Sequence, residues 1–119
     1  MKINREHVHS KYNGRCAYCG QEITLKQMQV DHYYPKRMPN LAAHYGGFSD
    51  VNHIDNLMPA CRQCNHYKRS DQPKSWRITM ATLHQRIEKI YINRVAVNFG
   101  MVTIKPWDGK FYFEKFNQP

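Results

Sequence analysis

The hydrophobic pattern divides the chain into two parts at about residue 75. Before this point, apolar residues occur in short clusters separated by turn-forming residues. After it, they recur every three or four positions, which is the period of an amphipathic helix. This stripe consists of Trp76, Met80, Leu83, Ile87 and Ile90. Polar and charged residues flank it, so we expect the stripe to pack in a core rather than to bind a partner.

The end of the chain alternates between apolar and polar residues, as a half-buried strand does. The alternation occurs on both sides of the turn sequence Pro-Trp-Asp-Gly at residues 106–109. It predicts a β-hairpin with strands at residues 101–105 and 111–116. Residues 75–116 are therefore expected to form an amphipathic helix followed by a hairpin.

The first part of the chain predicts short elements around a long loop. Residues 4–12 have the spacing of a short helix, with Asn4 as its N-cap. Strands are expected at 26–32 and 56–60, and a further helix begins near Cys61. Residues 33–55 are rich in proline, glycine and other turn formers. A loop of this length in so small a domain is usually functional.

A chain of 119 residues, 41% of them hydrophobic, predicts a single folded domain over residues 1–119. No apolar run approaches the roughly 18 residues that cross a membrane. Residues 1–6 also lack the apolar run of a signal peptide. We therefore expect a cytoplasmic protein that does not bind membranes. Its oligomeric state is left open between a monomer and a weak dimer.

The composition is strongly basic. Eighteen Lys and Arg residues oppose nine Asp and Glu residues, which gives a formal net charge of +9. Such an excess suits a polyanionic partner, because neutralised phosphates release their condensed counterions. DNA is the expected partner, and a soluble basic protein without such a partner is the alternative.

Four cysteines form two Cys-x-x-Cys pairs, Cys16 with Cys19 and Cys61 with Cys64. Without signs of secretion, reduced thiolates on a metal are favoured over disulfides. Such pairs deliver two ligands at a time to a tetrahedral structural Zn²⁺. The second pair begins 42 positions after Cys19, so the metal would join the ends of a long insert. A redox Cys-x-x-Cys is the competing interpretation, but no thioredoxin-like βαβ pattern supports it.

Between and beside these pairs lie the candidate catalytic residues Asp31, His32, Asn56 and Asn65. Carboxylate and amide oxygens are hard ligands, so Asp31 and Asn65 are candidate ligands of a catalytic Mg²⁺ or Mn²⁺. A neutral imidazole takes a proton from water readily near pH 7, which makes His32 the candidate general base. Asn56 is expected to bond the loop backbone and fix the imidazole's orientation. Together these residues predict metal-dependent hydrolysis of phosphodiesters.

Four nearby cations are candidate DNA contacts: Lys36, Arg37, Lys68 and Arg69. A solvated surface is an equally good interpretation of these residues. His44 and His53 are expected to be ordinary loop histidines rather than ligands.

These motifs resemble the HNH endonuclease family. The resemblance rests on Gly-Arg-Cys-Ala-Tyr-Cys-Gly at 14–20, Val-Asp-His at 30–32 with Pro35, Asn-Leu at 56–57, and Cys-x-x-Cys-Asn-x-x-Lys at 61–68. It covers residues 14–69, about half the chain. It implies an α+β fold in which residues 14–70 form a small ββα-metal (His-Me finger) core with a four-cysteine zinc knuckle.

The resemblance also implies roles for single residues. His32 corresponds to the family's first histidine and general base, and Asn56 to its middle asparagine. Asn65 occupies the position of the final histidine, so the chain resembles an H-N-N variant in which Asn65 ligates the metal. The adjacent His66 is the alternative ligand. Neighbouring residues on a helix are turned by about 100°, and this rotation favours Asn65.

The leading hypothesis is therefore a metal-dependent DNA endonuclease. A non-catalytic zinc-knuckle module that binds nucleic acid is the alternative, but such a module has no use for Asp31, His32 and Asn65 together. A zinc-scaffolded protein-interaction domain explains neither the charge nor the Asp-His pair.

Overall fold

The computed structural model describes residues 2–116 and divides into two compact units. Unit 1 contains the described residues up to Pro73 together with those from Phe111 onward, and unit 2 is Lys74–Lys110. The expectation of a single domain over the whole chain is not tested by this division and stays a prediction. None of the described helices is long and apolar enough to cross a membrane.

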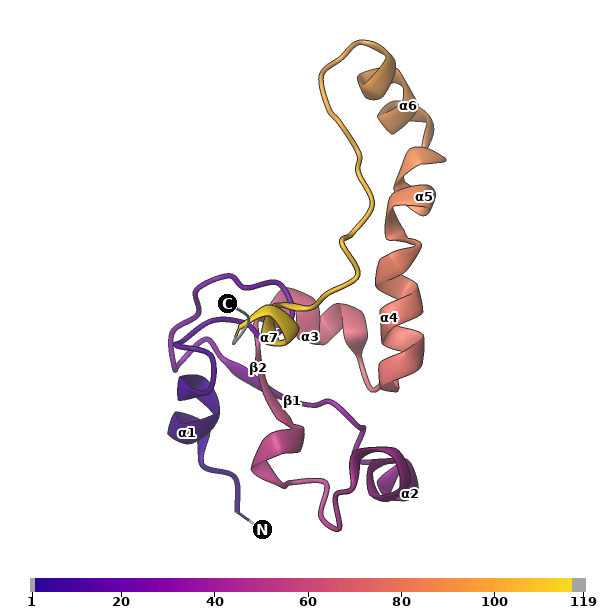
Figure 1. Ribbon diagram of the computed structural model, residues 1–119. Helices are drawn as coiled ribbons and strands as arrows, with labels where there is room; N and C mark the ends of the chain where they lie inside the picture. Colours follow the sequence, from indigo (N-terminus) through magenta and orange to yellow (C-terminus); the bar gives the residue numbers. More distant parts are fainter. Residues whose placement is uncertain (1, 117–119) are drawn as a thin grey trace. The chain divides into compact units, whose positions relative to one another are not determined.

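Unit 1 is built on a two-stranded antiparallel sheet (Figure 1). Strand β1 (Gln29–His32) pairs with β2 (Leu57–Ala60), and His32 lies opposite Leu57. Both strands were expected, and both are shorter than predicted. The backbone and side chains of Thr24 and Gln27 bond each other in a turn before β1. A 3-10 helix, η2 (Ile54–Asn56), occupies the residues before β2.

Unit 1 also contains helices before, between and after the two strands. Helix α1 (Arg5–Ser10) confirms the predicted opening helix, and the Asn4 side chain caps it by accepting a hydrogen bond from the His7 N–H. The long loop contains α2 (Pro39–Leu41) and the π-helix η1 (Ala42–Gly46). Helix α3 (Arg62–Lys68) begins directly after Cys61, as expected. The core of unit 1 includes Val8, Cys16, Ala17, Met28, Leu57, Met58 and Phe111.

The predicted C-terminal hairpin is wrong. Among the described residues, neither 101–105 nor 111–116 forms a strand, and the end of the chain folds into helix α7 (Tyr112–Lys115). The Phe111 N–H donates to the Glu114 carboxylate, and the next two N–H groups donate to the carbonyls of Tyr18 and Ala17. These donors are therefore used by a helix cap and by the first cysteine turn instead of a second strand.

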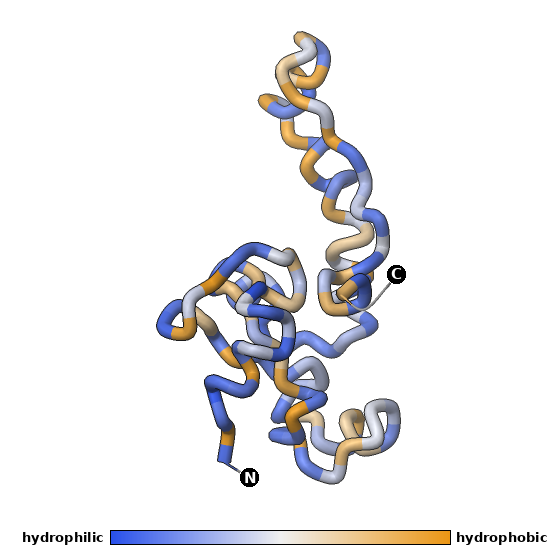
Figure 2. The backbone as a smooth tube through the Cα atoms, turned by 60° about the vertical axis from the view of Figure 1, so that its left-hand side comes forward, coloured by the Kyte–Doolittle hydropathy of each residue, from blue (hydrophilic) through white to orange (hydrophobic). Residues whose placement is uncertain are grey.

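Unit 2 corrects the prediction of one amphipathic helix, because the stripe is divided among three. These are α4 (Pro73–Ala81), α5 (Leu83–Glu88) and α6 (Tyr91–Asn98). The Thr82 hydroxyl donates to the Ile78 carbonyl at the first break. At the second break Ile90 is extended, and its N–H and the Asn93 side chain both donate to the carbonyl of Ile87. Figure 2 shows hydrophobic and hydrophilic residues interleaved along these helices.

Candidate functional site

The four cysteines meet at one point in unit 1. All four sulfur atoms lie within 4.8 Å of one another, and the Sγ atoms of Cys19 and Cys61 are 3.8 Å apart. The first pair is held in a tight turn, in which the Gly20 N–H donates to the Cys16 carbonyl. Gly20 has φ +79°, a left-handed conformation that glycine adopts without steric cost. The second pair lies at the start of α3, where the Cys64 N–H donates to Cys61 Sγ.

This cluster fits a tetrahedral zinc ion. Zn–S bonds of about 2.3 Å place the sulfurs of a tetrahedron about 3.8 Å apart, whereas a disulfide needs about 2.0 Å. Hydrogen bonds from Cys19 and Cys64 lower the pKa of the Cys16 thiol, and the contacts with Cys16 raise the pKa values of Cys19 and Cys64. The donor set and its spacing therefore suit a structural zinc better than a redox pair.

Asp31 lies in β1 with only 6% of its surface exposed. Its Oδ2 atom accepts a 2.5 Å hydrogen bond from the Tyr18 hydroxyl and pairs at 3.0 Å with Nζ of Lys68. No hydrogen bond from the described residues reaches Oδ1. One carboxylate oxygen therefore fixes the orientation of the side chain, and the other remains available as a ligand.

The protonation states in this cluster follow from burial. Burial raises the pKa of Tyr18 well above its usual value, so the phenol stays protonated and donates to Asp31. Burial also raises the pKa of Asp31, and the Lys68 ammonium opposes this effect without cancelling it. The stability that Asp31 contributes is therefore greatest at low pH and falls as the pH rises through its raised pKa.

Asn65 lies on α3, next to β1. Its Nδ2 donates at 2.5 Å to Oε1 of Gln29, so this hydrogen bond does not use Oδ1 of Asn65. Gln29 and Asp31 are two apart on a strand and share one face, while Asn65 and Lys68 are three apart on a helix and also share one face. The Gln29–Asn65 and Asp31–Lys68 contacts place these two faces against each other. Asp31 and Asn65 thus come from adjoining surfaces and both offer hard oxygen donors.

His32 ends β1, where its side chain is half-buried. Its Nε2 atom lies 2.7 Å from Oδ1 of Asn52, a loop residue that the sequence did not single out. Nζ of Lys68 donates to the His32 carbonyl at 3.1 Å, so Lys68 holds both residues of the Asp-His pair.

Asn56 is fully buried and fastens the long loop. Its Oδ1 accepts from the Tyr34 N–H at 2.8 Å, and its Nδ2 donates to the carbonyls of Tyr34 and Val51 at 3.1 and 2.8 Å. These bonds join the residues after β1 to those before β2. Asn56 therefore bonds the loop backbone, as expected, while the imidazole itself is bonded by Asn52.

We expect Asn56→Ala to destabilise the protein by about 1–3 kcal/mol, because it removes the hydrogen-bond partner of the Tyr34 N–H and of the Tyr34 and Val51 carbonyls. Urea unfolding monitored by circular dichroism would measure the loss. Asn40→Ala, at an exposed position of the same loop, is the control and should leave the midpoint unchanged. Equal midpoints for the two variants would contradict the role assigned to Asn56.

Comparison of the sequence with known proteins identifies a family for part of the chain. Residues 16–71 match the sequence profile of the HNH endonuclease family. These residues belong to that family. Over 58 residues, the chain is 33% identical to the CRISPR-associated endonuclease Cas9 of Corynebacterium diphtheriae. The match covers 49% of this chain and only 4% of that relative. No solved structure shows significant similarity to the chain.

The HNH segment, residues 16–71, places the predicted DNA-contacting cations in different surroundings. Lys36 and Arg69 are exposed. Arg37 is exposed as well and donates to the side chain and carbonyl of Ser70. Lys68 instead has a fully buried side chain that pairs with Asp31. His66, the alternative ligand, is exposed on α3 beside the partly buried Asn65.

Three supporting residues of the HNH segment were missed by sequence reasoning: Tyr18, Gln29 and Asn52. Strand alternation carries a signal for Gln29, since it lies two positions before Asp31 and shares its face. Tyr18 lies between the first two cysteines, where no periodic pattern applies. Asn52 lies in the long loop, and its contact with His32 depends on the path of that loop.

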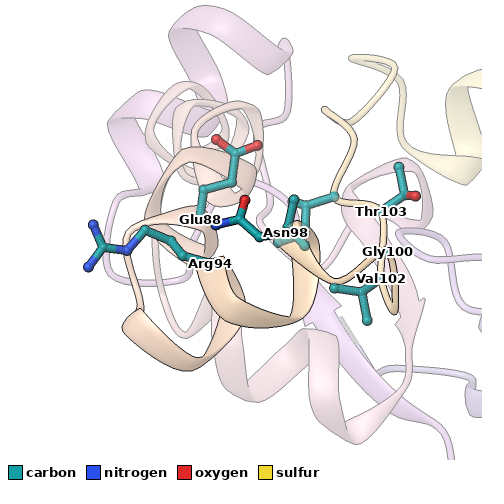
Figure 3. A pocket seen from close by; sticks show the side chains of 8 residues that line it. Glu88, Arg94, Asn98, Gly100, Val102 and Thr103 are labelled. Carbon is teal, nitrogen blue, oxygen red and sulfur yellow. The ribbon is translucent and has the colours of Figure 1, made fainter.

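Unit 2 has an open pocket lined by the end of α5, by α6 and by the segment that follows (Figure 3). Glu88 and Arg94 are its charged lining residues, and the others are polar or apolar. The lining contains none of the predicted catalytic residues. The pocket therefore adds no candidate group to the site in the HNH segment.

Proposed function

We propose that this protein is a metal-dependent DNA endonuclease that hydrolyses phosphodiester bonds. The observation that carries the proposal is the Asp31-His32 pair at the end of β1, held by Lys68 and lying against the α3 face that bears Asn65. A carboxylate with an open oxygen, an amide oxygen and an imidazole are the groups that such a hydrolysis requires. The order β1, β2, α3 beside the cysteine cluster supports a ββα-metal core.

In the proposed mechanism, His32 takes a proton from the water that attacks phosphorus. Oδ1 of Asp31 and Oδ1 of Asn65 would hold a Mg²⁺ or Mn²⁺ ion, and both are hard donors. When bound, this ion supplies positive charge that stabilises the phosphate oxygens and the leaving oxygen. Asn56 and Lys68 hold the backbone and the carboxylate in place.

DNA is the proposed substrate because of charge and family. The net charge of +9 favours a polyanion, and the exposed cations Lys36, Arg37 and Arg69 flank the candidate site in sequence. The similar region of the Cas9 relative is a small part of a protein whose name describes an endonuclease. We propose only the cleavage chemistry from this likeness, since the chain spans a small fraction of that protein.

Cleavage of supercoiled plasmid with Mg²⁺, compared with cleavage in EDTA, tests this function. His32→Ala is expected to slow cleavage by about 10²–10⁴-fold, because it removes the general base and no metal ligand. The variant should keep its zinc and its affinity for non-cleavable DNA. Gel quantification of nicked and linear products would give the rates.

His66→Ala is the matched control, since His66 is an exposed neighbour of Asn65. It should cut like the wild type, whereas Asn65→Ala should lose activity together with its affinity for Mn²⁺. An inactive His66→Ala beside an active Asn65→Ala would assign the ligand to His66. A wild-type protein that binds DNA but does not cut it with any divalent ion would favour the non-catalytic binding module.

A further inference from the structure

We propose that Asn52 is a positioning residue that holds His32 in a single tautomer, with the proton on Nε2 and the lone pair on Nδ1. The inference rests on the proposed function, because it specifies which nitrogen of the general base takes the proton from water. It assigns a role to a loop residue that stands four positions before Asn56.

The first step is the contact itself. Oδ1 of Asn52 lies 2.7 Å from Nε2 of His32, which is a short hydrogen bond. An amide oxygen only accepts, so the ring nitrogen that faces it must carry the proton. A neutral imidazole has one protonated nitrogen, and Nδ1 must then hold the lone pair. No hydrogen bond from the described residues occupies Nδ1.

The second step is that Asn52 is itself held in place. Its N–H donates to Oδ1 of Asp50 at 2.8 Å, and the His53 N–H donates to the Asp50 carbonyl at 3.0 Å. The preceding carbonyl, that of Val51, accepts from the buried Asn56 side chain. The loop around Asn52 is therefore fixed on both sides, and its amide oxygen is presented to the imidazole at a defined place.

The third step is the consequence for the reaction. A base in the wrong tautomer presents an N–H, rather than a lone pair, to the attacking water. The contact with Asn52 favours one tautomer and one ring orientation without touching the substrate. Removing the supporting partner of a metal-bound histidine costs about 10–100-fold in metal affinity or activity, and we expect a loss of similar size for the partner of a general base. We expect this loss in kcat, with KM for DNA unchanged, because Asn52 makes no proposed substrate contact.

The experiment measures the tautomer directly. The zinc-loaded protein, labelled with ¹⁵N in histidine, reports the protonated nitrogen of each ring through its ¹⁵N chemical shifts, and His32→Ala assigns the signals. The wild type should show the Nε2–H form at His32. Asn52→Leu should give a mixture of tautomers, and Asn52→Asp should restore the Nε2–H form because it keeps an acceptor oxygen. Ser49→Ala, at an exposed position of the same loop, is the control.

Plasmid cleavage by the same variants gives the second measurement. Asn52→Leu should lose about 10–100-fold in kcat and Asn52→Asp should recover most of it. Asn52→Ala is a second truncation to use if the leucine variant unfolds. An unchanged Nε2–H tautomer in a folded truncation variant would overturn the inference.

The two readouts separate this inference from the proposed function. A wild type that shows the Nε2–H form, loses it in Asn52→Leu, and yet cuts no DNA would support the role of Asn52 and refute the nuclease. A wild type that cuts DNA with His32 in the Nδ1–H form would support the nuclease and refute the role of Asn52.

Discussion

Replacing Cys61 with serine is expected to unfold unit 1. Cys61 belongs to the four-sulfur cluster and also caps α3, so its loss removes a candidate zinc ligand at the start of that helix. Structural zinc sites bind with about 10–16 kcal/mol, whereas small domains are stable by about 5–15 kcal/mol in total. Loss of the ion therefore removes free energy comparable with the whole stability of the fold. Circular dichroism and metal analysis of the purified protein would measure both changes.

Gln63→Ala is the matched control for this variant. Gln63 is exposed and lies between the two cysteines of the second pair. It should retain one zinc ion per chain and melt like the wild type. Treatment of the wild type with a strong chelator should reproduce the loss seen in Cys61→Ser. A wild type without zinc whose melting temperature equals that of Cys61→Ser would refute the zinc site.

Lys68→Met is expected to destabilise the protein by about 3–5 kcal/mol, because it leaves the Asp31 carboxylate buried without its cation. The ammonium of Lys68 is fully buried, 3.0 Å from Oδ2 of Asp31, and it also donates to the His32 carbonyl. Methionine preserves most of the apolar stem, so the loss reports on the charge. Chemical unfolding near neutral pH would measure it.

The pH dependence adds a check on the Lys68 prediction. At acidic pH Asp31 is protonated, and its uncompensated charge disappears from the variant. Because burial raises the pKa of Asp31, the difference between Lys68→Met and the wild type should shrink as the pH falls through that raised pKa. Arg69→Met, the exposed neighbour, should change stability by no more than about 0.5 kcal/mol at any pH. A loss in Lys68→Met no larger than in Arg69→Met would contradict the buried ion pair.

The sequence by itself determined the parts of this protein that depend on composition and local spacing. The two Cys-x-x-Cys pairs predicted the four-sulfur cluster, because two such pairs commonly deliver four thiolates to one metal ion. Asn4 predicted the cap of α1, and the motif around Asp31 predicted a family that residues 16–71 match. These features depend on residues that are neighbours in the chain or on residue types that have few structural roles.

Predictions from local spacing were wrong where backbone N–H groups donate to acceptors elsewhere in the chain. The alternation before and after residues 106–109 predicted a hairpin, but the N–H groups that follow Phe111 donate to the carbonyls of the first cysteine turn. The helical stripe predicted one helix, but Thr82 and Ile90 interrupt it. A period of two or of 3.6 reports which residues share a face, and it does not report which groups accept the hydrogen bonds.

Only the tertiary structure decided how the candidate catalytic residues are supported. Asn52 lies 20 positions from His32, and Lys68 lies 36 positions from the His32 carbonyl that it bonds. From sequence, Lys68 is a surface cation like Arg69, yet the packing of α3 on β1 buries it beside Asp31. Contacts across such separations depend on the path of the loop between them and on the burial of both partners. Neither the residue types nor the spacing of apolar residues determines the loop path or this burial. Only the folded structure could therefore show these contacts.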